Sequence, residues 1–230
     1  MKKLVAAFFL ISATAVWAGD FEDGAAAYNK GDFTTAATLF KKGAEQGDSA
    51  AQYNLAFMYD NGKGVLQDYA EAVRWYKLAA AQGYSEAQNN LAFMYGYGKG
   101  VLQDHAEALR WNKLAAEQGN SVAQYNLALR YYNGEGVLQD DAQANRWYKL
   151  SAEQGYSPAQ HHLAWMYVHG EGVLQDYLQA HMWVNLAAVS GDKDAQKAID
   201  VIAQGMTPQQ IAKAQEMAKK CQASQFKDCE

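Results

Sequence analysis

Three histidines lie close together in the sequence and are the side chains best suited to metal binding. His161, His162 and His169 fall on one predicted helix. His161 and His169 are about 12 Å apart along a helix, so one ion cannot join them. No cysteine or further histidine stands at helical spacing to complete a ligand set. His105 and His181 are isolated. We interpret all five as solvated or hydrogen-bonded side chains, and we predict no metal site and no cofactor.

Patterns that would indicate catalysis are weak. Ser190/Lys193 and Ser224/Lys227 match the Ser-x-x-Lys element of penicillin-recognising enzymes, but no Ser-Asp-Asn or Lys-Thr-Gly accompanies them. The chain has no phosphate-binding loop, and its Gly-x-Gly elements lack the third glycine of a dinucleotide fingerprint. We therefore predict no catalytic residues and a chain that is not an enzyme.

The sequence contains two cysteines, Cys221 and Cys229, both near the C-terminus. In an oxidising compartment they are candidates for a disulfide that would hold the C-terminal tail against the last helix. The alternatives are a free pair and a redox site, although Cys-x7-Cys lacks the spacing typical of redox pairs.

The elements that carry these residues follow a repeat of 36 residues. The segment from Gly62 to Asp68 (Gly-Lys-Gly-Val-Leu-Gln-Asp) returns three times, at 98–104, 134–140 and 170–176, with Glu135 and Glu171 replacing the lysine in the last two. Flanking residues return at the same interval, among them Ala51, Leu55 and Tyr59 before the glycines and Trp75 after them. Self-similarity at a fixed period of this length is the signature of a repeat architecture.

Each repeat is predicted to form two helices. In the first, Ala51, Leu55 and Tyr59 are spaced at i, i+4 and i+8 and form one apolar stripe. In the second, Ala72, Trp75 and Ala79 supply the buried face. A single helix pair cannot bury such stripes, whereas stacked neighbours can. The predicted fold is all-α, a right-handed α-solenoid (superhelix) of about twelve helices.

Helix boundaries are also repeated. Ser49 and Gln52 match a Ser-x-x-Gln capping box for the first helix. In the fourth repeat this places Pro158 at the first helical position. Asp68 is predicted to cap the second helix. A left-handed glycine is predicted after each second helix, at Gly83, Gly119, Gly155 and Gly191.

The ends of the chain differ from the repeats. Residues 1–18 combine Lys2 and Lys3, an apolar run and a Val-Trp-Ala ending, which is typical of a cleavable signal peptide. Residues 20–47 predict a shorter, tetratricopeptide-like helix pair. Residues 48–191 hold the four repeats, and residues 192–230 predict a more polar helical cap that includes a helix opening at Thr207 and Pro208.

The segment from Ala51 to Ala80, with its glycine pair, Gln-Asp and Ala-x-x-Trp-Tyr, resembles the Sel-1-like repeat over residues 48–191. This family is similar to tetratricopeptide repeats but has a longer loop between the helices. The resemblance implies helix-turn-helix repeats and adaptor work between proteins. Some cysteine-rich relatives are associated with penicillin binding and β-lactam hydrolysis. Those relatives carry a cysteine pair in every repeat, and these four repeats have none.

Residues that vary between repeats on the first helices are the candidates for recognition. On tetratricopeptide-like geometry they would line a concave groove of aromatic and amide side chains that suits a protein or peptide partner. The alternative for the aromatic residues is packing against the neighbouring repeat. The predicted groove residues are Tyr53, Asn54, Asn89, Asn90, Phe93, Tyr97, Tyr125, Asn126, Tyr132, His161, Trp165 and His169.

Charge and the signal peptide narrow the class of function. The formal net charge is −5, which argues against nucleic-acid binding. No second long apolar stretch follows the signal peptide, so no transmembrane segment is predicted in the mature chain. We predict a periplasmic or secreted, non-catalytic scaffold that binds protein partners through the groove. The alternatives are a penicillin-binding hydrolase like the cysteine-rich relatives and a secreted effector that acts on host proteins.

Overall fold

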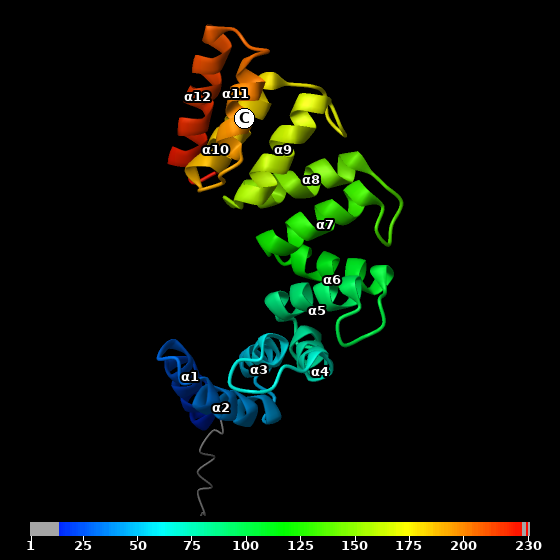
Figure 1. The fold of residues 1–230 in the computed structure, drawn as a ribbon, viewed down its shortest axis with the longest axis vertical. Helices are drawn as coiled ribbons and strands as arrows, with labels where there is room; N and C mark the ends of the chain where they lie inside the picture. Colours follow the sequence, from blue (N-terminus) through cyan, green and yellow to red (C-terminus); the bar gives the residue numbers. More distant parts are fainter. Residues whose placement is uncertain (1–13, 227–228, 230) are drawn as a thin grey trace, which may run out of the picture. The chain divides into compact units, whose positions relative to one another are not determined.

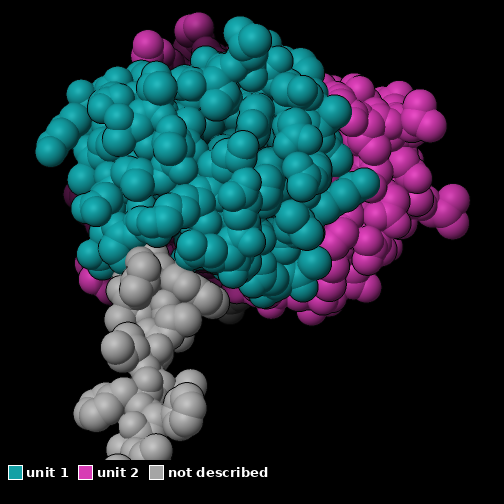
Figure 2. All heavy atoms as spheres, turned by 90° about the horizontal axis from the view of Figure 1, so that it is seen from below, with its two compact units in different colours: residues 1–84 teal, residues 85–230 magenta. Residues whose placement is uncertain are grey.

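The computed structural model describes residues 14–226 and 229. Within these residues it has twelve α-helices and no β-strand, as predicted (Figure 1). They form two compact units, residues 1–84 and residues 85–230 (Figure 2). The predicted signal peptide lies outside the described residues up to residue 13, and its last residues belong to the first helix.

Each unit is built from consecutive helix pairs. The first unit contains α1 (Thr14–Asn29), α2 (Phe33–Glu45), α3 (Ser49–Asn61) and α4 (Tyr69–Ala81). The second contains α5 (Ser85–Tyr97), α6 (His105–Glu117), α7 (Ser121–Asn133), α8 (Asp141–Ala152), α9 (Ser157–His169), α10 (Tyr177–Val189), α11 (Ala195–Ala203) and α12 (Pro208–Ala223). Within the second unit, α5 packs on α6, α7 on α8 and α9 on α10, and α6–α7 and α8–α9 contacts join successive pairs (Figure 1).

The predicted apolar stripes form the core. Ala51 and Leu55 are buried, as are their counterparts in every repeat, and Tyr59 is half-buried. On the second helices Ala72, Trp75 and Ala79 are buried. Small alanines let the helices approach closely, and the aromatic rings fill the space between them. None of the helices in the described part of the chain has the length and apolarity needed to cross a bilayer.

The predicted Ser-x-x-Gln capping box is wrong. The residue before the serine caps the first helix: the Asp48 carboxylate accepts the Ala51 N–H at 2.8 Å. Gln52 instead donates to the Ala44 carbonyl at the end of the preceding helix and accepts from the Gln82 amide. The long glutamine side chain thus satisfies a carbonyl that a helix C-terminus leaves without a partner. The pairs Gln88–Gln118 and Gln124–Gln154 repeat the glutamine contact at 2.7 Å.

The predicted caps of the second helices are confirmed. Asp68 accepts the N–H groups of Ala70 and Glu71, and Asp104, Asp140 and Asp176 occupy the same N-cap position. Glu71 does not reach back to complete a capping box. It pairs with Arg74 at 3.1 Å and accepts the Trp75 indole N–H at 3.1 Å. Arg74 and Arg110 are therefore each ion-paired within their own helix.

The first helix of the fourth repeat, α9, has a different N-terminus from α3 and α7. Its N-cap is Tyr156, which makes no side-chain capping bond. Pro158 occupies the second helical position, not the first as predicted, because α9 begins at Ser157. The Ser157 hydroxyl donates to the Ala187 carbonyl at 3.2 Å, so it ties α9 to α10.

The two glycines of each inter-helix loop have separate roles. Gly134 has φ +72° and ends α7 in the left-handed conformation. Gly136 also has positive φ, and a Cβ there would overlap the backbone of His105 at the start of α6. Gly64 and Gly172 make the same close approach to Phe33 and Asp141. The first glycine therefore permits the turn, and the second permits the preceding helix pair to pack against the loop.

The C-terminal helices cover the last repeat. α11 and α12 pack on α10, where Met182 is fully buried in one core cluster with Ala218 and Cys221. Met182 stands in the repeat position of the exposed arginines Arg74, Arg110 and Arg146, and the C-terminal helices cover it. Thr207 and Gln210 form a complete capping box, and a disulfide joins Cys221 to Cys229.

Candidate functional site

The predicted groove residues differ in their exposure to solvent. Tyr53 and Asn54 lie in the first unit, and the other ten lie in the second. The exposed members are Phe93, Tyr97, Trp165 and His169, and the remaining eight are half-buried. Exposed aromatic rings on one helix face are the side chains that a partner can cover.

Several predicted groove residues contact neighbouring helices or their own helix. Tyr53 stacks on Tyr84 with ring centroids 5.0 Å apart. Tyr125 packs against three rings, those of Tyr148, Tyr156 and His162. These two tyrosines therefore take part in packing, which was the alternative considered for the aromatic residues.

The asparagines of the predicted groove also have partners. The Asn54 amide donates to the Ala50 carbonyl of its own helix at 2.8 Å. The Asn126 amide donates to Asn89 Oδ1 at 2.8 Å and joins α7 to α5. Asn90 is half-buried on α5. The Asn89–Asn126 pair therefore joins two helices, whereas Asn54 is bonded within its own helix.

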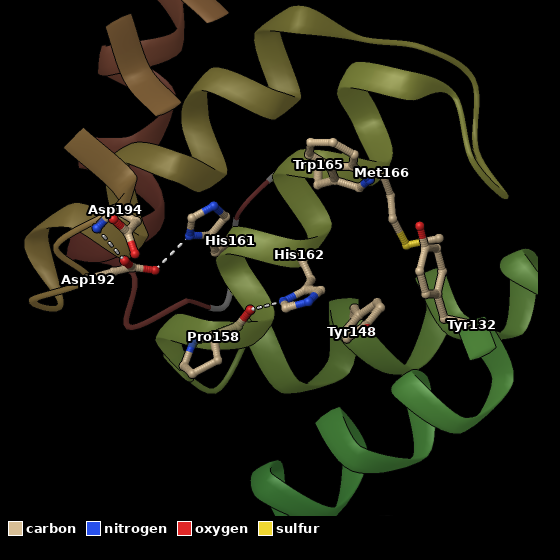
Figure 3. Close-up of a pocket in the computed structure, with 9 residues that line it drawn as sticks. All are labelled: Tyr132, Tyr148, Pro158, His161, His162, Trp165, Met166, Asp192 and Asp194. Carbon is tan, nitrogen blue, oxygen red and sulfur yellow. Dashed lines mark hydrogen bonds and ion pairs between the residues drawn. The ribbon is translucent and has the colours of Figure 1, made fainter. Parts of the chain in front are cut away.

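The main candidate site is a pocket of 440 Å³ between α9, the helices α7 and α8, and the loop before α11 (Figure 3). Successive turns of α9 supply most of its wall, from Pro158 to Met166. Tyr132 of α7 and Tyr148 of α8 close one side, and the loop before α11 closes the other. The lining residues are Tyr132, Tyr148, Pro158, His161, His162, Trp165, Met166, Asp192 and Asp194.

A second pocket of 340 Å³ adjoins the first and shares His161 and Trp165 with it. Its lining is mostly aliphatic and includes residues of α11. The remaining lining residues are Ala164, Val168, His169, Val184, Lys197, Ala198, Val201 and Ile202. We refer to the two pockets together as the α9 hollow. Trp165 is 50% exposed and lies where the two pockets meet.

Hydrogen bonds fix the acidic side of the hollow. His161 Nδ1 lies 2.8 Å from Asp192 Oδ2, and Asp192 Oδ1 accepts the backbone N–H groups of Asp194 and Ala195 (Figure 3). Burial acts to raise the pKa of Asp192, but the hydrogen bonds from His161 and the two amides outweigh it and lower the pKa below its usual value. Asp192 thus caps the backbone immediately before α11, which begins at Ala195.

The tryptophan and tyrosine of the hollow are also held in place. The Trp165 and His169 rings are 3.8 Å apart at their centroids, and His169 Nδ1 lies 2.9 Å from the Trp165 carbonyl oxygen. The Tyr132 hydroxyl donates to Glu171 at 3.0 Å, which raises the pKa of Tyr132. Rings held by neighbours lose little conformational freedom when a partner binds.

His162 and Tyr148 form the deep wall of the first pocket. Their rings stack with centroids 5.2 Å apart, and His162 Nδ1 donates to the Pro158 carbonyl at 3.0 Å. Burial lowers the pKa of His162 and raises that of Tyr148, so both side chains are neutral near pH 7. Tyr148 is fully buried, and its hydroxyl has no hydrogen-bond partner among the described residues.

We expect His162→Asn to reduce the pH dependence of stability. The folded-state pKa of His162 lies below its unfolded value of about 6.5, so the unfolded chain binds the additional proton as pH falls. Stability is complete above that unfolded pKa and decreases below it. Asparagine is the residue at this position in the other three repeats, at Asn54, Asn90 and Asn126.

The measurement is urea unfolding at pH 8 and pH 5. The loss between these values should be smaller in His162→Asn than in the unchanged chain. His105→Tyr is the matched control because His105 is exposed and tyrosine occupies its position at Tyr69 and Tyr177. An identical loss in all three chains would contradict a lowered pKa for the half-buried His162.

The other histidines fit the interpretation as hydrogen-bonded or solvated side chains. His105 is exposed, and His181 is buried with its Nδ1 2.7 Å from the Asn185 amide nitrogen. Among the residues that the structure describes, no three His, Cys, Asp or Glu side chains converge as metal ligands. The residues that line the α9 hollow offer aromatic, aliphatic and carboxylate contacts to a ligand.

Sequence reasoning missed the walls of the hollow that lie outside the first helices. Tyr148 is on a second helix, and Asp192, Val201 and Ile202 belong to the C-terminal cap. One signal was available for Asp192: it stands in the repeat position of the observed caps Asp48 and Asn120. The apolar pair Val201–Ile202 in a segment expected to be polar was the other.

Comparison with known proteins agrees with this fold. The family model for the Sel1 repeat matches five consecutive segments, at residues 21–48, 49–84, 85–120, 121–156 and 157–192. The chain belongs to the Sel1 repeat family. The first match includes the helix pair that the sequence analysis set apart as tetratricopeptide-like. That pair is joined by residues 30–32, whereas α3 and α4 are joined by residues 62–68.

Two solved structures of Sel1 repeat proteins are similar to this chain. One is c5321, a protective antigen of uropathogenic Escherichia coli with an SLR fold (35% identity, TM-score 0.79, covering 92% of this chain and 47% of that one). The other is a Sel1 repeat protein from Oxalobacter formigenes (36% identity, TM-score 0.68, covering 74% of this chain and 50% of that one). This Sel1 repeat chain thus spans about half the length of each.

A Sel1 repeat protein from Klebsiella pneumoniae shares the fold at 24% identity (TM-score 0.54, covering 86% of this chain and 98% of that one). No curated protein matches this chain. The α-solenoid of helix-turn-helix repeats is therefore the architecture of this Sel1 repeat protein. Sel1 repeats in general serve as scaffolds for protein–protein interaction.

Proposed function

We propose that this Sel1 repeat protein is an exported, non-catalytic scaffold that binds an extended segment of a partner protein in the α9 hollow. The observation that carries the proposal is Trp165, a half-exposed ring that lies between two adjoining pockets of 440 and 340 Å³. Large aromatic side chains in such a position dominate the energetics of many interfaces.

The chemistry of the hollow suits a segment with both apolar and basic character. The second pocket offers Val168, Val184 and Ile202 to an apolar side chain. The first offers the Trp165 face, which favours a cation, beside Asp192, which is bonded to His161, and Asp194, which pairs with Lys197 of α11. The walls are ordered before binding, so affinity comes from a few anchors and less of it is lost to ordering.

Photo-crosslinking in cells that make the protein tests the proposal. A benzophenone amino acid replaces Val201, which is 67% exposed on the edge of the hollow. A matched control places the same group at Lys113, exposed on α6 away from the hollow. Irradiation should yield a partner adduct from position 201 and none from position 113. Equal adducts from both positions, or none from either, would contradict binding in the hollow.

The export and non-catalytic parts of the proposal have their own measurements. Export rests on the signal-peptide pattern of residues 1–18. Osmotic-shock fractionation should release the protein with the periplasmic contents, and recovery from the culture medium would favour the secreted effector. Hydrolysis of nitrocefin by the purified chain would overturn the non-catalytic assignment.

A further inference from the structure

One interface between repeats departs from the others at three positions together. Arg130 of α7 stands where the other repeats carry Met58, Met94 and Met166. Asn112 of α6 stands where two other repeats carry a tyrosine. Gly96, at the end of α5, is the third departure, since the other repeats have a side chain there. The three residues meet in space, so the change is concerted.

Arg130 is buried where the other repeats bury methionine. It is 7% exposed, and its Nε donates to Asn112 Oδ1 at 2.8 Å. A Cβ on Gly96 would lie 2.7 Å from Arg130 Nη2, so the glycine makes room for the guanidinium. The Asn112 amide donates to Asn89 Oδ1 at 3.3 Å, which orients its oxygen towards the arginine.

The charge of this guanidinium is only loosely balanced. Its ion-pair partner is Glu135, on the loop after α7, with the Glu135 Oε2 3.5 Å from Arg130 Nη1 and the carboxylate 45% exposed. The exposed pairs Arg74–Glu71 and Arg110–Glu107 are closer, at 3.1 and 3.0 Å. Burial of the cation lowers the pKa of Arg130, and a buried cation is costly without a well-placed anion.

Arg130 also lines a pocket of 210 Å³. The mouth of the pocket carries two exposed rings, Phe93 and Tyr97, 42% and 68% exposed, with centroids 4.5 Å apart. Asn126 and Leu129 line it from α7. The pocket therefore joins a buried guanidinium to two exposed aromatic rings, with Asn133 and Glu135 completing the polar part of its lining.

We propose that this Arg130 pocket binds a carboxylate carried by an apolar residue, with the ligand carboxylate replacing Glu135 on the guanidinium and the apolar side chain packing on Phe93 and Tyr97. Guanidinium and carboxylate match in a two-bond geometry that a point charge does not provide. The chemistry fits the C-terminus of a polypeptide or an acidic side chain beside an aromatic one. This pocket is separate from the α9 hollow and does not depend on binding there.

Titration of the full chain with small probes tests the proposal. N-acetyl-L-phenylalanine carries the carboxylate and the ring, and N-acetyl-L-phenylalaninamide carries the ring alone. The acid should bind saturably, with a shift of the Arg130 Nε–H resonance in ¹H–¹⁵N spectra, and about tenfold more tightly than the amide. Equal binding of both probes, or no saturable shift from the acid, would overturn the proposal.

A third probe separates the two sources of the carboxylate. N-acetyl-aspartyl-phenylalaninamide has a side-chain carboxylate beside the ring and no C-terminal one. Binding stronger than that of N-acetyl-L-phenylalanine supports an acidic side chain in the pocket, and weaker binding supports a polypeptide C-terminus.

Variants connect the binding to the proposed residues. Asn112→Tyr with Arg130→Met installs the residues of the other repeats and should abolish the preference for the acid. Arg130→Lys keeps the charge but loses the two-bond geometry, and should weaken acid binding severalfold while circular dichroism shows an intact fold. Arg74→Lys is the matched control, because it makes the same substitution at an exposed arginine that does not line the pocket, and it should leave binding of the acid unchanged. Retention of the acid preference in both Arg130 variants would contradict the proposal.

Discussion

Gly136→Ala is expected to destabilise the protein far more than Gly134→Ala, although both glycines have positive φ and both lie in the same loop. A Cβ at Gly136 would overlap the His105 carbonyl oxygen at the start of α6, and relief requires backbone of the preceding helix pair to move. The free energy of unfolding of Gly136→Ala should fall by about 1–2 kcal/mol because alanine is strained in the left-handed conformation. Overpacking against His105 should lower it by roughly 1–3 kcal/mol more.

Gly134→Ala supplies the matched control. A Cβ there would find its nearest atom, the Gln139 backbone nitrogen, at 3.5 Å, which is ordinary contact. The free energy of unfolding of this variant should fall only by the cost of placing alanine in the left-handed conformation. Urea unfolding followed by circular dichroism at 222 nm measures both. Equal losses would show that conformational freedom alone explains the glycine pair and that the approach to α6 has no energetic weight.

Comparing the sequence-based predictions with the structure shows how far a repeat pattern predicts structure. The period of 36 residues identifies equivalent positions, and helical spacing within one period separates buried from exposed ones. Ala51, Leu55 and Trp75 are therefore predicted correctly as core. The pattern does not say which atoms of the neighbouring repeat approach, so it does not distinguish the roles of the two glycines in each pair.

Local competition limits the prediction of helix caps. Asp48 and Ser49 are adjacent, and both are favourable N-cap residues. The sequence motif Ser-x-x-Gln favoured Ser49, but Gln52 bonds instead to the Ala44 carbonyl and to Gln82, thirty residues away. Without its glutamine the serine has no advantage, and Asp48 caps the helix. Local propensity does not distinguish Asp48 from Ser49 as the N-cap, and the tertiary contacts of Gln52 determine which of them caps the helix.

The candidate site shows the same limit. Variable positions on the first helices located Trp165, His161 and Tyr132, which do line the α9 hollow. Tyr148 and Asp192 come from other elements and required the packed structure. Arg130 was overlooked because its position is occupied by buried methionine in the other repeats. A charged residue in an otherwise apolar repeat position is the signal that could have identified it.

Replacement by alanine should lower stability strongly at Trp183 and only weakly at Trp165. Trp183 is 1% exposed in the core cluster that extends from α7 to α12, so Trp183→Ala should cost about 3–5 kcal/mol. Trp165 is 50% exposed, and Trp165→Ala should cost less than about 1 kcal/mol. Thermal unfolding monitored by circular dichroism gives both values.

Binding should follow the reverse order once stability is taken into account. In a chain that carries the benzophenone group at position 201, Trp165→Ala should reduce the yield of the partner adduct about tenfold or more, because a central aromatic anchor is lost. The fold around it stays intact, since its neighbour His169 and the wall residues of the hollow keep their own contacts. A fall in Tm for Trp165→Ala comparable to that for Trp183→Ala would place the ring in the core. An unchanged adduct yield with an unchanged Tm would show instead that the partner binds elsewhere, because then neither stability nor recognition depends on Trp165.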